Sequence, residues 1–593
     1  MSLLIGCAGT PAFVAEVCSR LSRGPHPRVR WRQSWGAIAC NDGADHMTAG
    51  GLGKPCPIVV SGRVHERLNG KGGLVSPEIV GAAGRAILDS GGGWLTENVW
   101  GRYVIAVADE DAQRLSIFRD PTGLHTVFHA SCPQGSVFAT QLDALAALGV
   151  LPLSVDAESL ASFVLAGTRP TPRMPLAGVS ELCPGTVLEW SSRGTSTRLF
   201  WNPAKFIAQS VSPEPDVLWK VFAGTVAAVV GEQVEIGVDV SGGLDSSALL
   251  AAVGEAVRHR SVRVKAVTLH HPDSASATEL PFARELAEFL GAEMVEVDFA
   301  EGLPFASLEE TLTRKWDRPT PHMLTGAMHR AQHAGAASAC CLLNGFGGDQ
   351  VFQARGDIPH FLADHCLAGD FGKFGAELSA ESTNTGTPYL PLLWKSLLIG
   401  LRQRRFATYW QPLPPPAWAA KELTRAAAAV ISAPSFWNSL EDVSPAKRAQ
   451  LFEIYDASAL ADRHFRSPEH IVEHPFLAQP VVELALALPM EALLSGSDDR
   501  ILFRRAVAGR IPQSIVERHA KGDHSGIYQL GLQAHQSVVE ELLMEGWLVA
   551  NRLVGKEALR DELLQAAQGY TPNLWPILNA VAVELWIRSW QLF

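Results

Sequence analysis

The chain has 593 residues, of which 47% are hydrophobic and 19% charged, and its formal net charge is -11. This length and apolar content exclude an intrinsically disordered protein and predict two or more domains, each with its own core. The acidic balance argues against a protein whose whole surface binds nucleic acid.

The first 200 or so residues are rich in short β-prone segments separated by turn residues. They predict an antiparallel, layered domain. At residues 1–18 glycines and a proline interrupt the apolar run and no basic residue precedes it, which favours a first strand and turn over a signal peptide. The clearest predicted strands cover residues 102–110, 114–120, 126–131 and 136–140.

Residues 204–216 are polar and contain proline, and we interpret them as a linker between a domain at residues 1–203 and a domain at residues 217–593. Beyond it, strands alternate with helices, an order that predicts a parallel sheet with right-handed crossovers. From about residue 355 the sequence is mostly helical. The predicted strands cover 234–240, 264–271 and 293–299. Two helices are predicted between them from apolar stripes, the first at Leu249, Val253 and Val257 and the second at Phe282, Leu286 and Leu290. The second helix is predicted to start at Thr278 and to stop at Gly291.

Nine cysteines are scattered through the chain, and no two have the CxxC spacing of a zinc or redox site. An odd, scattered set suits reduced thiols in a cytosol. No apolar run approaches the roughly 18 residues that a membrane span needs. We therefore expect a cytoplasmic protein, with neither a membrane nor a nucleic acid among its partners.

The stretch VEIGVDVSGGLDSSALL, residues 234–250, predicts a buried strand followed by two glycines and an apolar helix. Glycines let an anion approach the backbone, and the first turn of a helix has unpaired amides. Asp245 lies in this turn, where a carboxylate beside phosphates needs a bridging Mg²⁺. A ligand-free turn is the plainer alternative, but the full SGGLDSS pattern at the end of a parallel strand favours phosphate binding.

A second acidic turn follows in CLLNGFGGDQVF, residues 341–352, which is again a buried strand followed by glycines and one carboxylate, Asp349. Taken alone, this turn also suits an unrelated glycine loop. Two such turns at the same edge of one sheet would place Asp245 and Asp349 on opposite sides of one metal-bound pyrophosphate.

SGGLDSS is similar to the pyrophosphate loop of the N-type ATP pyrophosphatases, and the whole chain resembles the asparagine synthetase family. NGFGGDQVF resembles that family's second loop, residues 473–489 its PFLD segment, and residues 500–526 its late helix and lysine loop. WGRYVIAVADED and RDPTGLHTVFHA resemble its glutaminase-like domain. The resemblance implies an α/β protein with an N-terminal Ntn-hydrolase-like αββα domain. It also implies a C-terminal doubly wound parallel sheet, of the adenine nucleotide α-hydrolase type, with many helices.

In that family ATP is cleaved between its α- and β-phosphates, a carboxylate becomes an acyl-adenylate, and an amine displaces AMP. The resemblance therefore implies ATP and Mg²⁺ as cofactors, with Mg²⁺ held by Asp245 and Asp349. Lys521 takes the late lysine position, where a cation stabilises negative charge in the transition states. These three are the predicted catalytic residues. The predicted nucleotide contacts are Val240, Ser241, Gly242, Gly243, Asp245, Ser246, Ser247, Val267, Asn344 and Gly345.

The glutamine-hydrolysing members need an N-terminal cysteine. Aligning IGCAG, residues 5–9, with their CGIAG places Ile5 at the nucleophile position and leaves Cys7 two residues late, in the predicted strand. Ser2 could be exposed by methionine removal, but nothing else supports a serine nucleophile. We predict no glutaminase activity, so the attacking amine must belong to a substrate.

Other departures put aspartate as the substrate in doubt. Phe346 and Gln350 replace two acids of the second loop, and Ala478 replaces the aspartate of PFLD. Ile471 occupies the position of a family glutamate, with Glu469 and Glu473 as nearby substitutes.

Members without the N-terminal cysteine include the β-lactam synthetases and the lasso peptide cyclases, and GFGGD with KGDHSG looks most like the cyclases. The resemblance implies an enzyme that adenylates an Asp or Glu side chain of a precursor peptide and closes a macrolactam ring with the peptide's own α-amine. A leader peptidase and a leader-binding protein are further candidate partners. The alternatives are a β-lactam synthetase, a non-catalytic scaffold of peptide maturation and, less in keeping with the charge, a tRNA-modifying pyrophosphatase.

Overall fold

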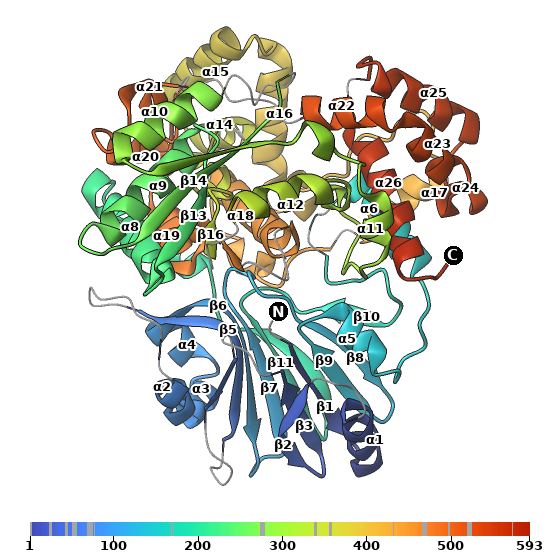
Figure 1. Cartoon of the computed structure of the whole chain (residues 1–593). Helices are drawn as coiled ribbons and strands as arrows, with labels where there is room; N and C mark the ends of the chain where they lie inside the picture. Colours follow the sequence, from blue (N-terminus) through green and yellow to red (C-terminus); the bar gives the residue numbers. More distant parts are fainter. Residues whose placement is uncertain are drawn as a thin grey trace.

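Figure 1 shows the chain as a computed structural model. The structure describes residues 3–593 apart from 23–26, 42–45, 50–55, 68–74, 76, 168, 170, 273–278, 337–340, 355–357, 431, 465–470, 496–497, 519–524 and 572. None of the helices described has both the length and the apolar character needed to cross a membrane. Thr278, the predicted helix start, lies outside the described residues.

The first 200 residues form two antiparallel sheets of six strands each. The first sheet has the order β10 (Val179–Glu181), β8 (Phe128–Cys132), β9 (Gly135–Ala139), β1 (Leu4–Gly9), β3 (Gly36–Cys40) and β2 (Arg28–Gln33). The second has the order β12 (Gly194–Leu199), β11 (Thr186–Ser191), β7 (Arg114–Arg119), β6 (Val99–Asp109), β5 (Ile58–Glu66) and β4 (His46–Ala49). The four strands predicted from the sequence are among them.

The two sheets are stacked, with helices on the outside (Figure 1). Alternation along β6 explains the layers: Val104 and Ala106 lie in the core between the sheets, while Ile105 and Val107 lie in the core beneath the outer helices. These outer helices are α2 (Pro77–Ala82), α3 (Gly84–Asp89) and α4 (Gly93–Asn98) on one side, and α1 (Pro11–Leu21) and α5 (Leu142–Ala147) on the other. The αββα arrangement expected from the sequence is confirmed.

The second half is built on a parallel sheet of five strands, in the order β15 (Glu293–Asp298), β14 (Arg263–His270), β13 (Glu235–Asp239), β16 (Cys341–Leu343) and β17 (Ile471–Glu473). Ala266 of β14 faces a core shared with α8 (Pro215–Val230) and α9 (Leu244–Val257), whereas the next residue, Val267, faces a core that includes Ala336 after α12 (Gly326–Gly335). Helices therefore cover both faces, as in a doubly wound sheet.

The C-terminal helices pack back onto the first half of the chain. α26 (Trp575–Ser589), which is buried on nearly every side, contacts α6 (Ala157–Ala166). Both helices belong to a core that also contains residues of α1 and β1. The predicted linker at 204–216 contains a short helix, α7 (Ala204–Ile207), and the first turn of α8.

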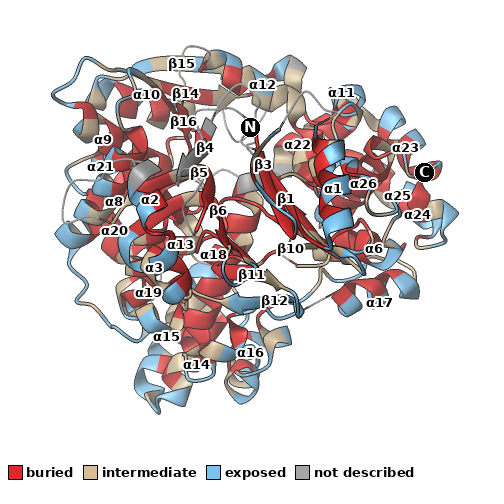
Figure 2. Cartoon of the chain, turned by 90° about the horizontal axis from the view of Figure 1, so that it is seen from below, coloured by how far each residue is buried: buried red, intermediate tan, exposed pale blue. Residues whose placement is uncertain are grey.

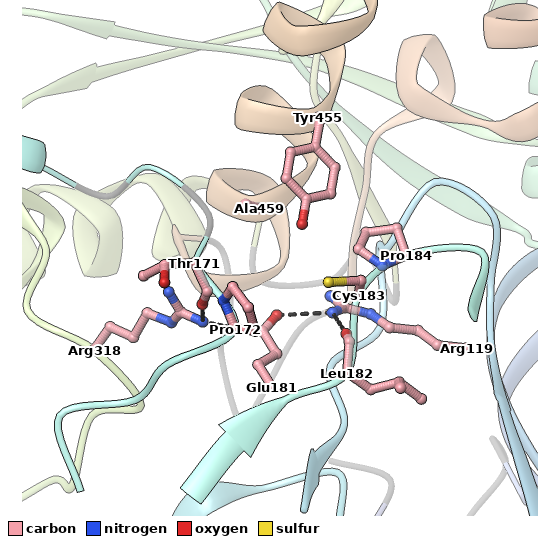
Figure 3. A pocket seen from close by; sticks show the side chains of 10 residues that line it. All are labelled: Arg119, Thr171, Pro172, Glu181, Leu182, Cys183, Pro184, Arg318, Tyr455 and Ala459. Atoms are coloured by element: carbon pink, nitrogen blue, oxygen red, sulfur yellow. Dashed lines mark hydrogen bonds and ion pairs between the residues drawn. The ribbon is translucent and has the colours of Figure 1, made fainter. Parts of the chain in front are cut away.

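A buried ion cluster joins the same two halves (Figure 3). Glu181, at the end of β10, accepts hydrogen bonds from Arg119 and Arg318. All three side chains are at most 6% exposed, and the hydroxyl of Tyr455 points toward Cys183 beside them. Because one buried carboxylate holds a guanidinium from each half, this cluster ties the two halves together.

Candidate active site

The first glycine loop connects β13 to α9. Gly242 has a φ of +69°, and a Cβ atom there would lie 2.8 Å from the carbonyl oxygen of Glu279, so only glycine fits. The amide of Ser241 donates to Oγ of Ser246 at 3.2 Å, which closes the loop over the first turn of the helix.

The start of α9 has the features of an anion site. The helix begins after Gly243 without a side-chain cap, so the amides of its first turn have no side-chain acceptor there. The hydroxyl of Ser247 is fully buried and makes no hydrogen bond within the described chain. A buried hydroxyl without a partner costs stability, and a phosphate oxygen would satisfy it. These donors fit the pyrophosphate of ATP.

The second glycine loop, between β16 and α13 (Gly348–Phe352), lies directly against the first. A Cβ atom on Gly345 would be 2.9 Å from the amide nitrogen of Ser246, and one on Gly348 would be 2.5 Å from Cγ of Asp245. Side chains at either position would push the loops apart. The structure thus brings Ser241, Gly242, Gly243, Asp245, Ser246, Ser247, Asn344, Gly345 and Asp349 to one edge of the sheet.

Asp245 and Asp349 share a cation, and that cation is Arg500. Its Nη1 atom lies 3.1 Å from Oδ2 of Asp245 and 2.8 Å from Oδ1 of Asp349. Burial by itself would lower the pKa of Arg500, but the two carboxylates and Asp499 outweigh burial and raise it. Two carboxylates that converge on one nitrogen face the same point, where a Mg²⁺ bound directly to one and through water to the other would also reach phosphate oxygens.

No group of three or more metal-ligating side chains occurs in the described part of the chain. Sequence reasoning missed Arg500, which lies 255 residues from Asp245 along the chain. It stands at a φ of +51°, immediately before α20 (Ile501–Val507), and this unusual backbone conformation is not visible in its sequence.

Two further predicted nucleotide contacts, Val240 and Val267, lie on neighbouring strands. Val240 directly follows β13, and its amide donates at 2.9 Å to the carbonyl of Val267, which lies within β14. Asn344 donates from Nδ2 to Oδ2 of Asp239 at 2.7 Å. Burial raises the pKa of Asp239 to about 6, and hydrogen bonds from Gln332 and Asn344 oppose that shift. Asp239 therefore ties the second loop to the central strand.

Lys521, the third predicted catalytic residue, lies outside the described residues. Arg518 precedes it by three positions, and its guanidinium donates to the carbonyl of Gly242 at 3.2 Å. A second nitrogen lies 3.4 Å from Glu279. The chain therefore reaches the first glycine loop just before the lysine segment begins. Arg518 was not predicted from the sequence.

The segment resembling PFLD supports the second loop from the other side. The carbonyl of Glu473, the last residue of β17, accepts from the amide of Asn344 at 3.0 Å. Its carboxylate lies 3.5 Å from Arg63 of β5, in the N-terminal domain. Ile471 pairs with Cys341 in the parallel sheet, and Glu469 lies outside the described residues.

Ile5, which the sequence alignment places at the glutaminase nucleophile, is an ordinary strand residue in the structure. Ile5 is 2% exposed and pairs with Ala39 on one side and Ala139 on the other. Cys7 is fully buried in the same strand, and burial raises the pKa of its thiol to about 12. Since the thiolate is the nucleophilic form, Cys7 is inert at neutral pH.

Comparison with solved structures gives only weak similarities. The allosteric regulatory enzyme of purine biosynthesis is 12% identical, with 51% of this chain and 81% of that chain covered and a TM-score of 0.20. Glutamine phosphoribosylpyrophosphate amidotransferase from B. subtilis is 12% identical, with coverages of 60% and 93% and a TM-score of 0.21. The U34-tRNA thiolase NcsA from Methanococcus maripaludis is 14% identical, with coverages of 44% and 88% and a TM-score of 0.21. Scores this low support no argument, and no curated protein matches.

Family models give a clear result. The model for asparagine synthase matches residues 218–588, which include both glycine loops and Arg500. The model for the glutamine amidotransferase domain matches residues 85–201, in the stacked sheets. The chemistry of the first family is ATP-dependent amide formation, with ATP and Mg²⁺. The chain belongs to the asparagine synthase family and carries an N-terminal glutamine amidotransferase domain.

Proposed function

We propose that this chain is an ATP-dependent lasso peptide cyclase. It adenylates the side chain of an Asp or Glu in a precursor peptide and then joins that carbonyl to the peptide's α-amine. The observation that carries the proposal is a contrast within one chain. The phosphate loops and their acid pair are complete, whereas Ile5 and the buried Cys7 replace a working glutaminase nucleophile. With no ammonia made internally, the amine must come with the substrate.

In the first step a carboxylate oxygen of the peptide attacks the α-phosphorus of ATP, and pyrophosphate leaves. The loop amides and the hydroxyls of Ser246 and Ser247 hold the departing pyrophosphate. Asp245 and Asp349 would hold the Mg²⁺, which supplies charge neutralisation when it is bound. Arg500, which lies between these two acids, would add a further positive charge beside the phosphates.

In the second step the peptide's α-amine attacks the acyl carbon, AMP leaves, and the nitrogen loses a proton. The peptide product is lighter than its precursor by one water. Because both reacting groups belong to one molecule, holding the peptide folded provides much of the rate enhancement. Lys521 is proposed to stabilise the negative charge that develops on the phosphorus and then on the tetrahedral carbon.

Further proposals concern the rest of the chain. We propose that residues 1–203 form a structural domain without glutaminase activity, that 204–216 link it to the synthetase domain at 217–593, and that the enzyme works in the cytoplasm. The contact of Arg63 with Glu473 supports the structural role of the first domain, because it supports the second loop through β17. A leader peptidase and a leader-binding protein are the proposed partners, besides the precursor peptide.

The experiment is incubation with Mg²⁺-ATP and synthetic linear peptides that have a free α-amine and one internal Asp or Glu. AMP is followed by chromatography and the peptide by mass spectrometry. We expect AMP and a peptide lighter by one water, both dependent on Asp245. AMP formation with small β-amino acids only would indicate a β-lactam synthetase instead, and no AMP with any carboxylate would indicate a scaffold. Glutamine should stimulate neither reaction, and glutamate release from glutamine would contradict the absence of a glutaminase.

A further inference from the structure

α16 (Tyr389–Arg402) has two apolar faces on opposite sides. Leu392, Ser396 and Ile399 point into the protein and are at most 5% exposed. Leu390, Trp394, Leu398 and Leu401, at spacings of four, four and three, form a second stripe that is 63%, 63%, 43% and 83% exposed. At 3.6 residues per turn these two sets lie about 170° apart around the helix. The outer stripe is therefore not the rim of the inner core.

Neighbouring elements extend this exposed stripe. Leu367, at the end of α14 (Ile358–Leu367), is 48% exposed and lies beside Gly400 of α16. Phe371, the first residue of α15 (Phe371–Thr385), is 68% exposed. Seven of the sixteen large hydrophobic side chains that are exposed among the described residues fall between 367 and 401. Such clustering marks an interaction surface rather than scattered exposure. We call this surface the α16 face.

Along α16 the charge is the reverse of that of the whole chain, whereas the segment from Asp370 to Glu381, which contains Phe371, carries three acids and Lys373. The chain has a net charge of -11, but residues 382–421 contain no Asp or Glu. Lys395, Arg402, Arg404 and Arg405 are all exposed along and just beyond α16. Basic side chains beside a stripe of Leu and Trp suit an anionic surface with an apolar interior.

The α16 face lies at the end of the molecule opposite the N-terminal sheets (Figure 1), among the exposed helical surfaces seen at the lower edge of Figure 2. Four of the exposed side chains form the stripe on α16, and Leu367 and Phe371 lie on the two neighbouring helices. An exposed apolar stripe of this kind can enter the boundary between lipid headgroups and acyl chains, with Trp at the interface and arginines reaching the headgroups.

We propose that the α16 face binds the surface of an anionic lipid bilayer, so that the enzyme associates with membranes without crossing them. This revises the expectation from the sequence that no membrane is among the partners. It concerns a surface separate from the catalytic loops and holds whatever the substrate is.

Vesicle flotation of the full-length protein tests the proposal. We expect flotation with vesicles of phosphatidylglycerol and phosphatidylcholine, and much less with phosphatidylcholine alone or at high salt. Trp394→Glu combined with Leu401→Glu should lower the partition coefficient at least about tenfold. Changing Arg402, Arg404 and Arg405 to Gln should lower it about fivefold per arginine.

The matched control is Tyr570→Glu combined with Val234→Glu, since these side chains are 75% and 72% exposed elsewhere on the surface. The control should float like the wild type, and all variants should keep the wild-type circular dichroism melt. Failure of the wild type to float with anionic vesicles would overturn the proposal, as would flotation of the Trp394/Leu401 variant at wild-type level. Sedimentation without lipid provides a further check. A dimer that this variant abolishes, with no lipid binding by the wild type, would show that the α16 face contacts a second copy instead.

Discussion

Arg500→Met tests the geometry of the acid pair before any substrate is known. The guanidinium is 8% exposed and lies between Asp245 and Asp349. Methionine keeps much of the apolar volume and removes the charge. The variant removes the guanidinium that lies between the two carboxylates.

The size of the effect follows from the contact distances. The carboxylate oxygens of Asp349 and Asp245 lie 2.8 and 3.1 Å from the same Nη1 atom, so they are separated by no more than the sum of these distances. Two unit charges at about 5 Å repel by about 3 kcal/mol at an effective dielectric constant of about 20. Asp349 is 25% exposed, and the nearby water reduces this repulsion energy. We expect the free energy of unfolding to fall by about 2–4 kcal/mol in buffer without divalent ions.

Magnesium should reverse the loss. Thermal melts with and without Mg²⁺, in the absence of nucleotide, measure how far the ion replaces the arginine, since a ligand of the folded state raises stability with its concentration. We expect a large Mg²⁺-dependent rise in Tm for Arg500→Met and little change for the wild type. Adding Asp349→Asn to this variant should restore stability without Mg²⁺ and remove the response to the ion.

Arg505→Met is the matched control, because Arg505 is exposed on α20, the helix that begins directly after Arg500. It should melt like the wild type under both conditions. The reasoning is refuted if Arg500→Met is as stable as the wild type without Mg²⁺ and does not respond to the ion, because the two acids would then not be close enough to share a cation.

Three further predictions concern the loops. Asp239, whose pKa is raised to about 6, takes up a proton as the pH falls through that value; this raises the free energy of unfolding but weakens the hydrogen bond that Asn344 donates. The wild-type kcat/KM should therefore fall below about pH 6, and Asp239→Asn should lack that decline. Arg63→Met should lower kcat about tenfold, because β17 loses its contact with the first domain. Adding Glu473→Gln to this variant should lower kcat little further; additive effects in this double-mutant cycle would contradict a coupling between Arg63 and Glu473. Lys521→Ala should slow AMP formation about 10²- to 10³-fold in single-turnover assays while ATP still binds, and an unchanged rate would exclude the lysine from the chemistry.

The sequence was informative wherever its pattern was local. The β-prone segments between turn residues, and the glycine and acid spacing in both loops, predicted layered sheets and turns at one sheet edge. Burial of Cys7 followed from its place within a predicted strand.

Features that depend on pairing of distant segments were not predictable in this way. Nothing near Arg500 in sequence indicates that it lies between Asp245 and Asp349, because that contact needs three separate segments to converge. The short strand β17 was missed for a similar reason: its three residues pair with β16, more than a hundred residues earlier in the chain. The packing of α26 against α6 likewise depends on the tertiary fold, since a helix buried on nearly every side carries no stripe that identifies its partner.

The central claim is that the two acidic glycine loops activate a carboxylate by joining it to AMP. The most direct measurement uses a peptide whose Asp or Glu side-chain carboxylate carries ¹⁸O, with mass analysis of the AMP and pyrophosphate formed. The account predicts one ¹⁸O atom in AMP, none in pyrophosphate, and no labelled AMP from Asp245→Asn. Labelled phosphate formed together with ADP, or AMP without label, would contradict it.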